Sequence, residues 1–263
     1  MRYDERVLAY IDLIGFSTAI NETIKENKED EDKIINIFNI LDDINEINKP
    51  SATPINSKTV SHFSDCAAIS YLKEEKGGIF HILSDILFLS YGILQKGLLF
   101  RGAITCGKLF HTKENLFGPA MLYAVKMEKE LAIYPRIILD KEILAIAEEH
   151  PAEYCPKGQL KVIKKLILKD FDGLYYLNYF DAINYIVDQE YGILLYFKPL
   201  RENIINLQKK AESDISVKAK YLWLKNKYNT VLKKYKTKYE NIKTQSKFPE
   251  SYDYIKGVNL IAE

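Results

Sequence analysis

The chain has 263 residues, of which 47% are hydrophobic and 28% charged, and its formal net charge is +1. This composition is typical of a soluble globular protein with one large domain, or one domain and an appendage. The near-neutral charge argues against stable nucleic-acid binding, and no stretch reaches the roughly 18 to 20 apolar residues of a membrane span. Three widely spaced cysteines fit neither a disulfide framework nor a zinc site, and indicate a reducing cytoplasm.

Residues 7–14 form an apolar run that only Asp12 interrupts. Such a run predicts a strand buried on both faces. Because an unpaired buried carboxylate is costly, Asp12 should meet a cation or a metal ion. Gly15 and Ser17 follow as a turn and a possible helix cap, which places backbone N–H groups where an anion could sit. The alternative is a buried Asp12 that only caps the next helix.

The next elements follow from the spacing of apolar residues and from glycine and proline. They are two helices within residues 17–49, a hairpin over 59–72 with Ser64 and Asp65 at its tip, an apolar helix over 79–94, a strand over 98–110, a helix from Gly118 to about residue 133, and a strand over 136–139. This order predicts an α+β fold with a βαββαβ core, a mainly antiparallel sheet and helices on one side.

The second half of the chain gives weaker signals. Residues 140–150 predict a short helix, residues 160–168 and 174–179 two strands around an Asp172-Gly173 turn, and residues 203–239 one long helix with a basic face. We therefore expect a first domain over residues 1–150 and a largely helical extension over 151–263. Dimer support or sensing is the suggested role of the extension.

Four segments together resemble the class III nucleotidyl cyclases, the adenylate and guanylate cyclase superfamily. They are Tyr-Ile-Asp-Leu-Ile-Gly-Phe-Ser at residues 10–17, Phe-Ser-Asp-Cys at 63–66, Arg-Gly-Ala-Ile-Thr-Cys-Gly at 101–107, and the helix from Phe117 to Glu128. Each motif is short, but the four stand in the family's order at compatible distances and cover about residues 7–139. The resemblance implies the ferredoxin-like cyclase core.

The resemblance also implies a site and a reaction. Asp12 and Asp65 would bind two Mg²⁺ or Mn²⁺ ions, with the backbone carbonyl of Leu13 as a further ligand. The backbone amides that would hold the β- and γ-phosphates are those of Gly15, Phe16 and Ser17. The ribose 3′-oxygen would attack the α-phosphate and pyrophosphate would leave. In this family the site lies between two cyclase domains, which implies a homodimer.

Four positions depart from the family pattern. Ser61 stands where purine enzymes have a base-reading Lys, and Asn115 where its Asp partner is usual. Both are neutral and can donate and accept hydrogen bonds, so a different base edge could be read. Leu122 replaces an Asn, and Lys126 replaces the transition-state Arg. Lys126 can supply charge to a phosphate but no planar fork.

These departures, in a cyclase domain without a recognisable sensor, resemble the pyrimidine cyclases of bacterial Pycsar antiphage systems. That resemblance implies UTP or CTP as substrate, a cyclic mononucleotide messenger and a separately encoded effector that responds to it. Two alternatives stay open. One is an inactive cyclase fold that senses a nucleotide, and the other is a palm-type polymerase or oligonucleotide synthetase.

Three other residues near these motifs receive ordinary interpretations. Arg101 could reach a phosphate, but a surface or dimer-edge position is the preferred interpretation. Cys66 adjoins Asp65 and is interpreted as a small buried residue. His111 lies in an expected turn and is given no role.

Overall fold

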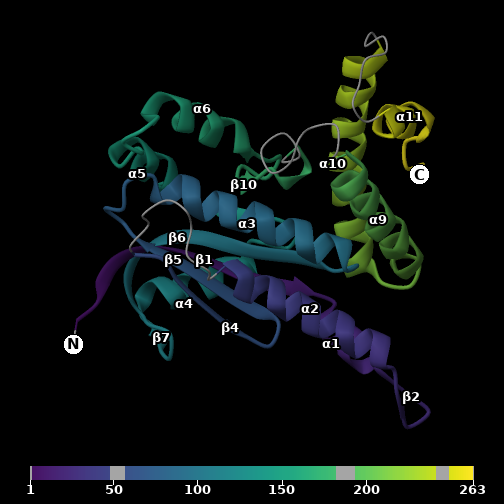
Figure 1. Cartoon of the computed structure of the whole chain (residues 1–263), viewed down its shortest axis with the longest axis horizontal. Coiled ribbons are helices and arrows are strands. Elements are labelled where there is room, and N and C mark those ends of the chain that lie inside the picture. Colours follow the sequence, from purple (N-terminus) through teal and green to yellow (C-terminus); the bar gives the residue numbers. More distant parts are fainter. Residues whose placement is uncertain (1, 48–56, 182–192, 241–248, 263) are drawn as a thin grey trace. The chain divides into compact units, whose positions relative to one another are not determined.

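The computed structural model describes residues 2–47, 57–181, 193–240 and 249–262 (Figure 1). The chain divides into two compact units, residues 1–177 and 178–263. The strands of the first unit are β1 (Asp4–Ile14), β2 (Ile24–Lys25), β3 (Lys28–Glu29), β4 (Thr59–Phe63), β5 (Cys66–Leu72), β6 (Leu99–His111), β7 (Leu116–Phe117), β8 (Ile137–Leu139), β9 (Ile167–Lys169) and β10 (Tyr175–Leu177). Its helices are α1 (Phe16–Asn21), α2 (Glu31–Ile47), α3 (Gly78–Gln95), α4 (Pro119–Glu130), α5 (Ile143–Glu149) and α6 (Pro156–Leu166).

The main sheet has the strand order β4-β5-β1-β6-β8-β10-β9. Its pairs are antiparallel except for β6 with β8, which is parallel. This confirms the predicted α+β fold with a βαββαβ core and a mainly antiparallel sheet. The β9–β10 hairpin, which we expected in the C-terminal extension, joins this sheet because β10 pairs with β8. The first unit therefore runs to Leu177, beyond the boundary expected after residue 150.

Helices cover both faces of the sheet and not one face as expected (Figure 1). Leu8 of β1 packs against Ala120 and Ala124 of α4. Tyr71 of β5 pairs with the residue before Leu8, so it points to the opposite face. There its hydroxyl donates a hydrogen bond to Asp85 of α3 (2.5 Å). The long helix α3 and the shorter α4 thus enclose the central strands between them.

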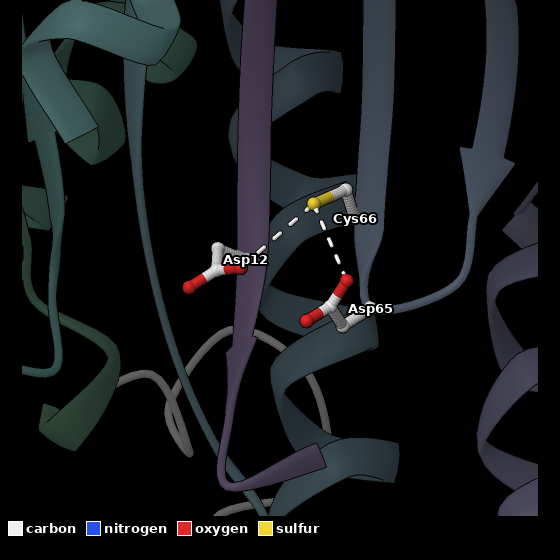
Figure 2. A group of neighbouring side chains, drawn as sticks. All are labelled: Asp12, Asp65 and Cys66. Atoms are coloured by element: carbon white, nitrogen blue, oxygen red, sulfur yellow. Dashed lines mark hydrogen bonds between the residues drawn. The ribbon is translucent and has the colours of Figure 1, made fainter. Parts of the chain in front are cut away.

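The register of the three central strands places three side chains in one row. Asp12 of β1 lies opposite Cys66 of β5 (Figure 2). On its other side it lies opposite Arg101 of β6. Side chains that are directly opposite share a face, so all three point to the α4 side. Gly102 maintains the close approach of β6, because a Cβ at this position would lie 2.1 Å from the carbonyl oxygen of Tyr10.

Helix α3 is the one helix among the described residues that is long and apolar enough to cross a membrane. More than half of its length is buried inside the first unit. The buried side chains include Ile82, Leu83 and Ile93, none of which is measurably exposed. Core helices of globular proteins have the same composition, and α3 packs here as a core helix.

Two predictions in the second half were wrong. Most of the strand predicted over residues 160–168 is helix α6, because Leu160, Ile163 and Leu166 recur at helical spacing after Pro156 at the first helical turn. The single helix predicted over residues 203–239 is two helices. They are separated at Asp214, whose side chain accepts hydrogen bonds from backbone N–H groups at the start of the second helix.

The second unit is helical. Its elements are η1 (Tyr179–Asp181), the π-helical turn η2 (Ile193–Phe197), α9 (Lys198–Ala211), α10 (Ile215–Glu240) and α11 (Pro249–Gly257). Its core is aromatic, since the rings of Phe197 and Tyr228 stack with centroids 4.3 Å apart and Phe180 meets Trp223 edge-on at 5.5 Å. Aromatic pairs of this geometry add stability beyond the area that they bury.

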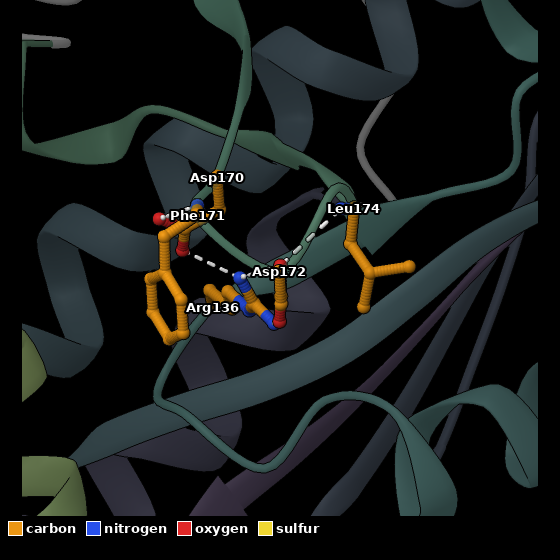
Figure 3. Close-up of polar contacts among 5 residues, drawn as sticks. All are labelled: Arg136, Asp170, Phe171, Asp172 and Leu174. Atoms are coloured by element: carbon orange, nitrogen blue, oxygen red, sulfur yellow. Dashed lines mark hydrogen bonds and ion pairs between the residues drawn. The ribbon is translucent and has the colours of Figure 1, made fainter.

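A buried arginine fastens the turn of the β9–β10 hairpin to the segment before β8 (Figure 3). The side chain of Arg136, just before β8, is fully buried and forms ion pairs with Asp170 and Asp172 in the hairpin turn. The guanidinium carbon of Arg136 lies 5.1 Å from the centroid of the Tyr134 ring. Asp170 is itself 1% exposed, so neither charge is solvated and each depends on the other.

We expect Arg136→Met to lower the free energy of unfolding by about 3–5 kcal/mol, because it leaves the Asp170 carboxylate buried without its cation. Urea denaturation followed by circular dichroism measures this change. The control is Lys164→Ala, which breaks an exposed 2.7 Å pair with Glu148 and should cost less than about 1 kcal/mol. Equal effects of the two substitutions would contradict the structural role of Arg136.

Candidate active site

Two carboxylates far apart in the sequence meet at one end of the central strands (Figure 2). Asp12 lies near the end of β1, and Asp65 lies in the turn between β4 and β5. One ligand atom from each, together with the sulfur of Cys66, lie within 4.8 Å of one another. The turn is fixed to β1 because the N–H of Leu13 donates to the carbonyl oxygen of Asp65 (2.9 Å). The predicted meeting of Asp12 and Asp65 is therefore present in the structure.

The Cys66 thiol lies between the two carboxylates. Its sulfur is 3.8 Å from Oδ1 of Asp12 and 3.7 Å from Oδ1 of Asp65, and 2.9 Å from the hydroxyl of Tyr10. Burial, and then the charges of Asp12 and Asp65, raise the pKa of Cys66 to about 11. Burial and the contact with Cys66 also raise the pKa of Tyr10. Both groups are therefore uncharged near neutral pH, and the carboxylates carry the charge of the site.

Arg101 connects Asp12 to a second carboxylate. Its Nε donates to Oδ2 of Asp12 (3.1 Å), and its terminal nitrogen Nη2 lies 2.7 Å from Oε1 of Glu128 on α4. The Glu128 side chain is 3% exposed and that of Arg101 is 27% exposed. Burial raises the pKa of Glu128, Arg101 opposes that shift, and Asp12 adds to it. The guanidinium is the cation that the sequence predicted for Asp12, and it leaves Oδ1 of Asp12 facing Cys66.

The donor set fits Mg²⁺ or Mn²⁺. Both ions prefer oxygen ligands, and Asp12 and Asp65 supply carboxylate oxygens at a partly exposed position. Zinc more often takes several cysteine and histidine ligands, and two carboxylates beside a single cysteine suit the oxygen-preferring ions better. Asp12 and Asp65 would hold the ion, with water or substrate completing its coordination.

The predicted phosphate-binding turn follows directly after β1. Gly15 has φ +87°, a conformation that glycine adopts easily and that lets the chain reverse into α1. A Cβ there would touch nothing within 4 Å, so the space over the turn is open. The side chain of Phe16 is buried and that of Ser17 is exposed. No side chain caps α1, so its first N–H groups have no side-chain acceptor.

Ser61 belongs to a buried polar chain that the sequence did not predict. Arg6 Nε donates to the Ser70 hydroxyl (2.8 Å), and that hydroxyl lies 2.8 Å from Nδ1 of His111. Nε2 of His111 lies 2.9 Å from the Ser61 hydroxyl, which points to the carbonyl oxygen of Thr112 (3.5 Å). We assign the hydrogens so that Ser70 donates to Nδ1 and Nε2–H donates to Ser61. Burial, and then Arg6, lower the pKa of His111 to about 4.

The remaining predicted residues lie at different places. Ser61 pairs with Ala68, two residues along β5 from Cys66, so it shares the sheet face of Asp12. Asn115 is exposed in the turn after β6, where its carbonyl oxygen accepts from the N–H of Thr112 (2.9 Å). Lys126 of α4 is 65% exposed and pairs with Glu130 at 4.0 Å. No contact joins Lys126 to Asp12 or Asp65 among the described residues.

Sequence reasoning underestimated three residues. Arg101 and Glu128 stood in the recognised segments, but no local pattern indicates that they pair. His111 has partners about 40 and 50 residues away. Residues 98–110 were expected to form a strand, but the sequence does not fix its register against the first strand, so Arg101 could not be placed opposite Asp12 from it.

We expect the acid stability of the protein to depend on His111. An unfolded histidine binds a proton near pH 6.5, whereas folded His111 binds one near pH 4. Between these values the unfolded state holds the extra proton, so His111 reduces stability as the pH falls, by at most about 1.4 kcal/mol per pH unit. Chemical denaturation between pH 7 and pH 4 should show a shallower pH dependence in His111→Gln. His62→Gln, at an exposed position, should retain the wild-type dependence, and equal slopes in all three would contradict the assignment.

No protein-family model matches the sequence, and no curated protein matches it. Solved structures that are similar to the chain include the adenylyl cyclase CyaB from P. aeruginosa, with 15% identity, a TM-score of 0.44, and coverage of 67% of this chain and 94% of that one. A bacterial light-regulated adenylyl cyclase has 13% identity, a TM-score of 0.41 and coverage of 62% and 58%. The catalytic core of a rhodopsin-guanylyl cyclase with converted specificity, in complex with ATPαS, has 12% identity, a TM-score of 0.42 and coverage of 67% and 96%. Identities and TM-scores this low assign no activity.

Proposed function

We propose that the chain is a metal-dependent nucleotidyl cyclase, which converts a nucleoside triphosphate to a 3′,5′-cyclic mononucleotide and pyrophosphate. The observation that carries the proposal is the meeting of Asp12 and Asp65 beside the open turn at Gly15. Both carboxylates stand in segments that resemble the two metal-binding segments of class III cyclases. Two carboxylates, one of them three residues before an open glycine turn, suit a reaction at a triphosphate.

In the proposed reaction the ribose 3′-oxygen forms a bond to the α-phosphorus while the bond to the pyrophosphate oxygen breaks. The 3′-hydroxyl proton passes to solvent water, and the pyrophosphate takes the negative charge. Bound Mg²⁺ or Mn²⁺ would lower the pKa of that hydroxyl and neutralise the leaving group. Asp12 and Asp65 would hold the metal ions, with the carbonyl of Leu13 as the proposed further ligand. The amides of the turn at residues 15–17 would position the β- and γ-phosphates.

A homodimer with shared sites accounts for the position of Lys126. This side chain is exposed on α4 and pairs only weakly with Glu130 in its own helix. In the proposed dimer it would supply positive charge to the phosphates bound by a second copy. Leu122 and Tyr123, one helical turn away, are 75% and 47% exposed, and this adjoining apolar pair suits an interface.

We propose a pyrimidine nucleotide, UTP or CTP, as the substrate. Ser61 lies on the same sheet face as Asp12, one row along, and is neutral where a purine-reading lysine would be charged. Asn115 is exposed in the turn that also accepts the hydrogen bond of Ser61. The further proposals are a messenger role in antiphage defence, a cytoplasmic location and a separate effector that binds the cyclic product. They rest on the family resemblance of these positions.

We expect the purified protein with Mn²⁺ and the four nucleoside triphosphates to release pyrophosphate and one cyclic mononucleotide, identified by mass spectrometry. Asp12→Asn and Asp65→Asn should each lower the rate at least about a hundredfold, because each removes a charge that holds the ion. Asp42→Asn, on the exposed face of α2, is the matched control and should keep the wild-type rate. Linear or oligomeric products would favour the palm-type alternative, and nucleotide binding without turnover would favour the sensor.

Shared sites predict complementation between two inactive variants. Lys126→Ala and Asp12→Asn should each be inactive alone, because every site in either homodimer lacks one group. Mixed in equal amounts and allowed to exchange subunits, they should recover about a quarter of the wild-type activity, since half of the dimers are mixed and each has one complete site. An absence of recovery, with exchange confirmed by mass spectrometry, would contradict a role for Lys126 across the dimer.

A further inference from the structure

We propose that Arg101 sets which divalent cation the site accepts, because it occupies one oxygen of Asp12 and leaves the other as a single ligand. This inference rests on the metal-binding role of Asp12 and Asp65 in the proposed function. A carboxylate with one available oxygen favours Mg²⁺ and Mn²⁺ over Ca²⁺. Arg101 is thus a specificity-determining residue that acts through Asp12.

The two oxygens of Asp12 have different surroundings. Oδ2 accepts a hydrogen bond from Nε of Arg101 at 3.1 Å. Oδ1 faces Cys66 at 3.8 Å, on the side where Asp65 also approaches (Figure 2). An ion shared by Asp12 and Asp65 would therefore meet Oδ1, while the guanidinium holds Oδ2. A cation at Oδ2 would also lie next to the guanidinium charge, which repels it, so such an ion binds Asp12 through Oδ1 as long as Arg101 keeps its position.

Arg101 keeps its position because a buried carboxylate requires it. The Glu128 side chain is 3% exposed and lies 2.7 Å from Nη2 of Arg101. If the guanidinium turned away, Glu128 would be buried without a cation, which is strongly unfavourable. The strand is fixed as well, since β6 approaches β1 closely at Gly102. The guanidinium of Arg101 thus contacts two carboxylates. The buried carboxylate, Glu128, keeps the guanidinium in contact with Asp12.

Cation size and coordination number give the selectivity. Mg²⁺ requires nearly octahedral geometry with six ligands, and Mn²⁺ accepts the same oxygen-rich sites. Ca²⁺ takes six to eight oxygens and often binds a carboxylate through both of its oxygens. Blocking Oδ2 of Asp12 removes a ligand that Ca²⁺ would use and the smaller ions do not need. The positive charge of Arg101 weakens the binding of every divalent cation, so the ratio of two affinities reports the geometric effect.

The test compares two full-length variants that differ only at Arg101. Glu128→Gln removes the buried charge, and the amide oxygen of the glutamine can still accept a hydrogen bond from Nη2 of Arg101, which keeps Arg101 on Asp12. The double variant R101M/E128Q frees Oδ2 without leaving a buried carboxylate unpaired, so it should fold; a melting curve by circular dichroism confirms this. Mn²⁺ binding is measured without nucleotide by electron paramagnetic resonance, and Ca²⁺ binding by its displacement of Mn²⁺.

We expect the ratio of the Mn²⁺ affinity to the Ca²⁺ affinity to be about tenfold lower in R101M/E128Q than in E128Q. Tenfold is the lower end of the change that follows when a metal ligand loses a hydrogen-bond partner. Wild type and E128Q should have the same preference within about twofold. A preference that stays the same in the double variant would overturn the role of Arg101 and leave the metal site intact. A wild-type chain that binds neither cation would contradict the metal site itself, and this inference with it.

Discussion

The position of β1 between β5 and β6 is the constraint on which the site depends. Side chains alternate along a strand, so a slip of one residue would move Asp12 to the face that α3 covers. The neighbours of Asp12 on that face, Ile11 and Leu13, are 1% and 3% exposed. A carboxylate there would lose its hydration and find no cation, at a cost that exceeds any gain from strand pairing. The close approach at Gly102 and the hydrogen bond of Leu13 to the Asp65 turn hold the functional register.

The charges on the α4 side of the sheet follow from this register. Asp12, Asp65 and Glu128 contribute three carboxylates and Arg101 one guanidinium, within a short distance of one another. Cys66 stays protonated and adds no charge. The excess of negative charge attracts cations, and the partly exposed position of the carboxylates lets them reach it. Arg101 therefore balances one of the three carboxylates, and the remaining negative charge can attract a metal ion.

The sequence was sufficient to predict those elements whose pattern lies within one short segment of the chain. The apolar run around Asp12, the hairpin tip at Asp65 and the helix at residues 79–94 follow from periodicity and turn residues, and the structure has all three. Residues 160–168 misled because Leu166, Ile167 and Leu168 form an apolar run in which a helix ends and a strand begins. Contacts that join distant residues, such as that of His111 with Ser61, leave no local pattern. The same is true of the sheet faces, which depend on where α4 returns after β6.

The geometry of α4 explains why one chain does not bring Lys126 to its own candidate site. Ala124 and Glu128 lie one helical turn apart on the face that packs against the sheet. Lys126 is two residues from each, a rotation of about 200° around the helix axis, so it must face away from the site of its own chain. A helix that buries Glu128 against Arg101 therefore cannot also deliver Lys126 to Asp12. If Lys126 neutralises phosphate charge, that phosphate is bound by a second copy of the chain. The ion pair of Arg101 with Glu128, which helps to orient Asp12, then also turns the Lys126 face of α4 toward that copy.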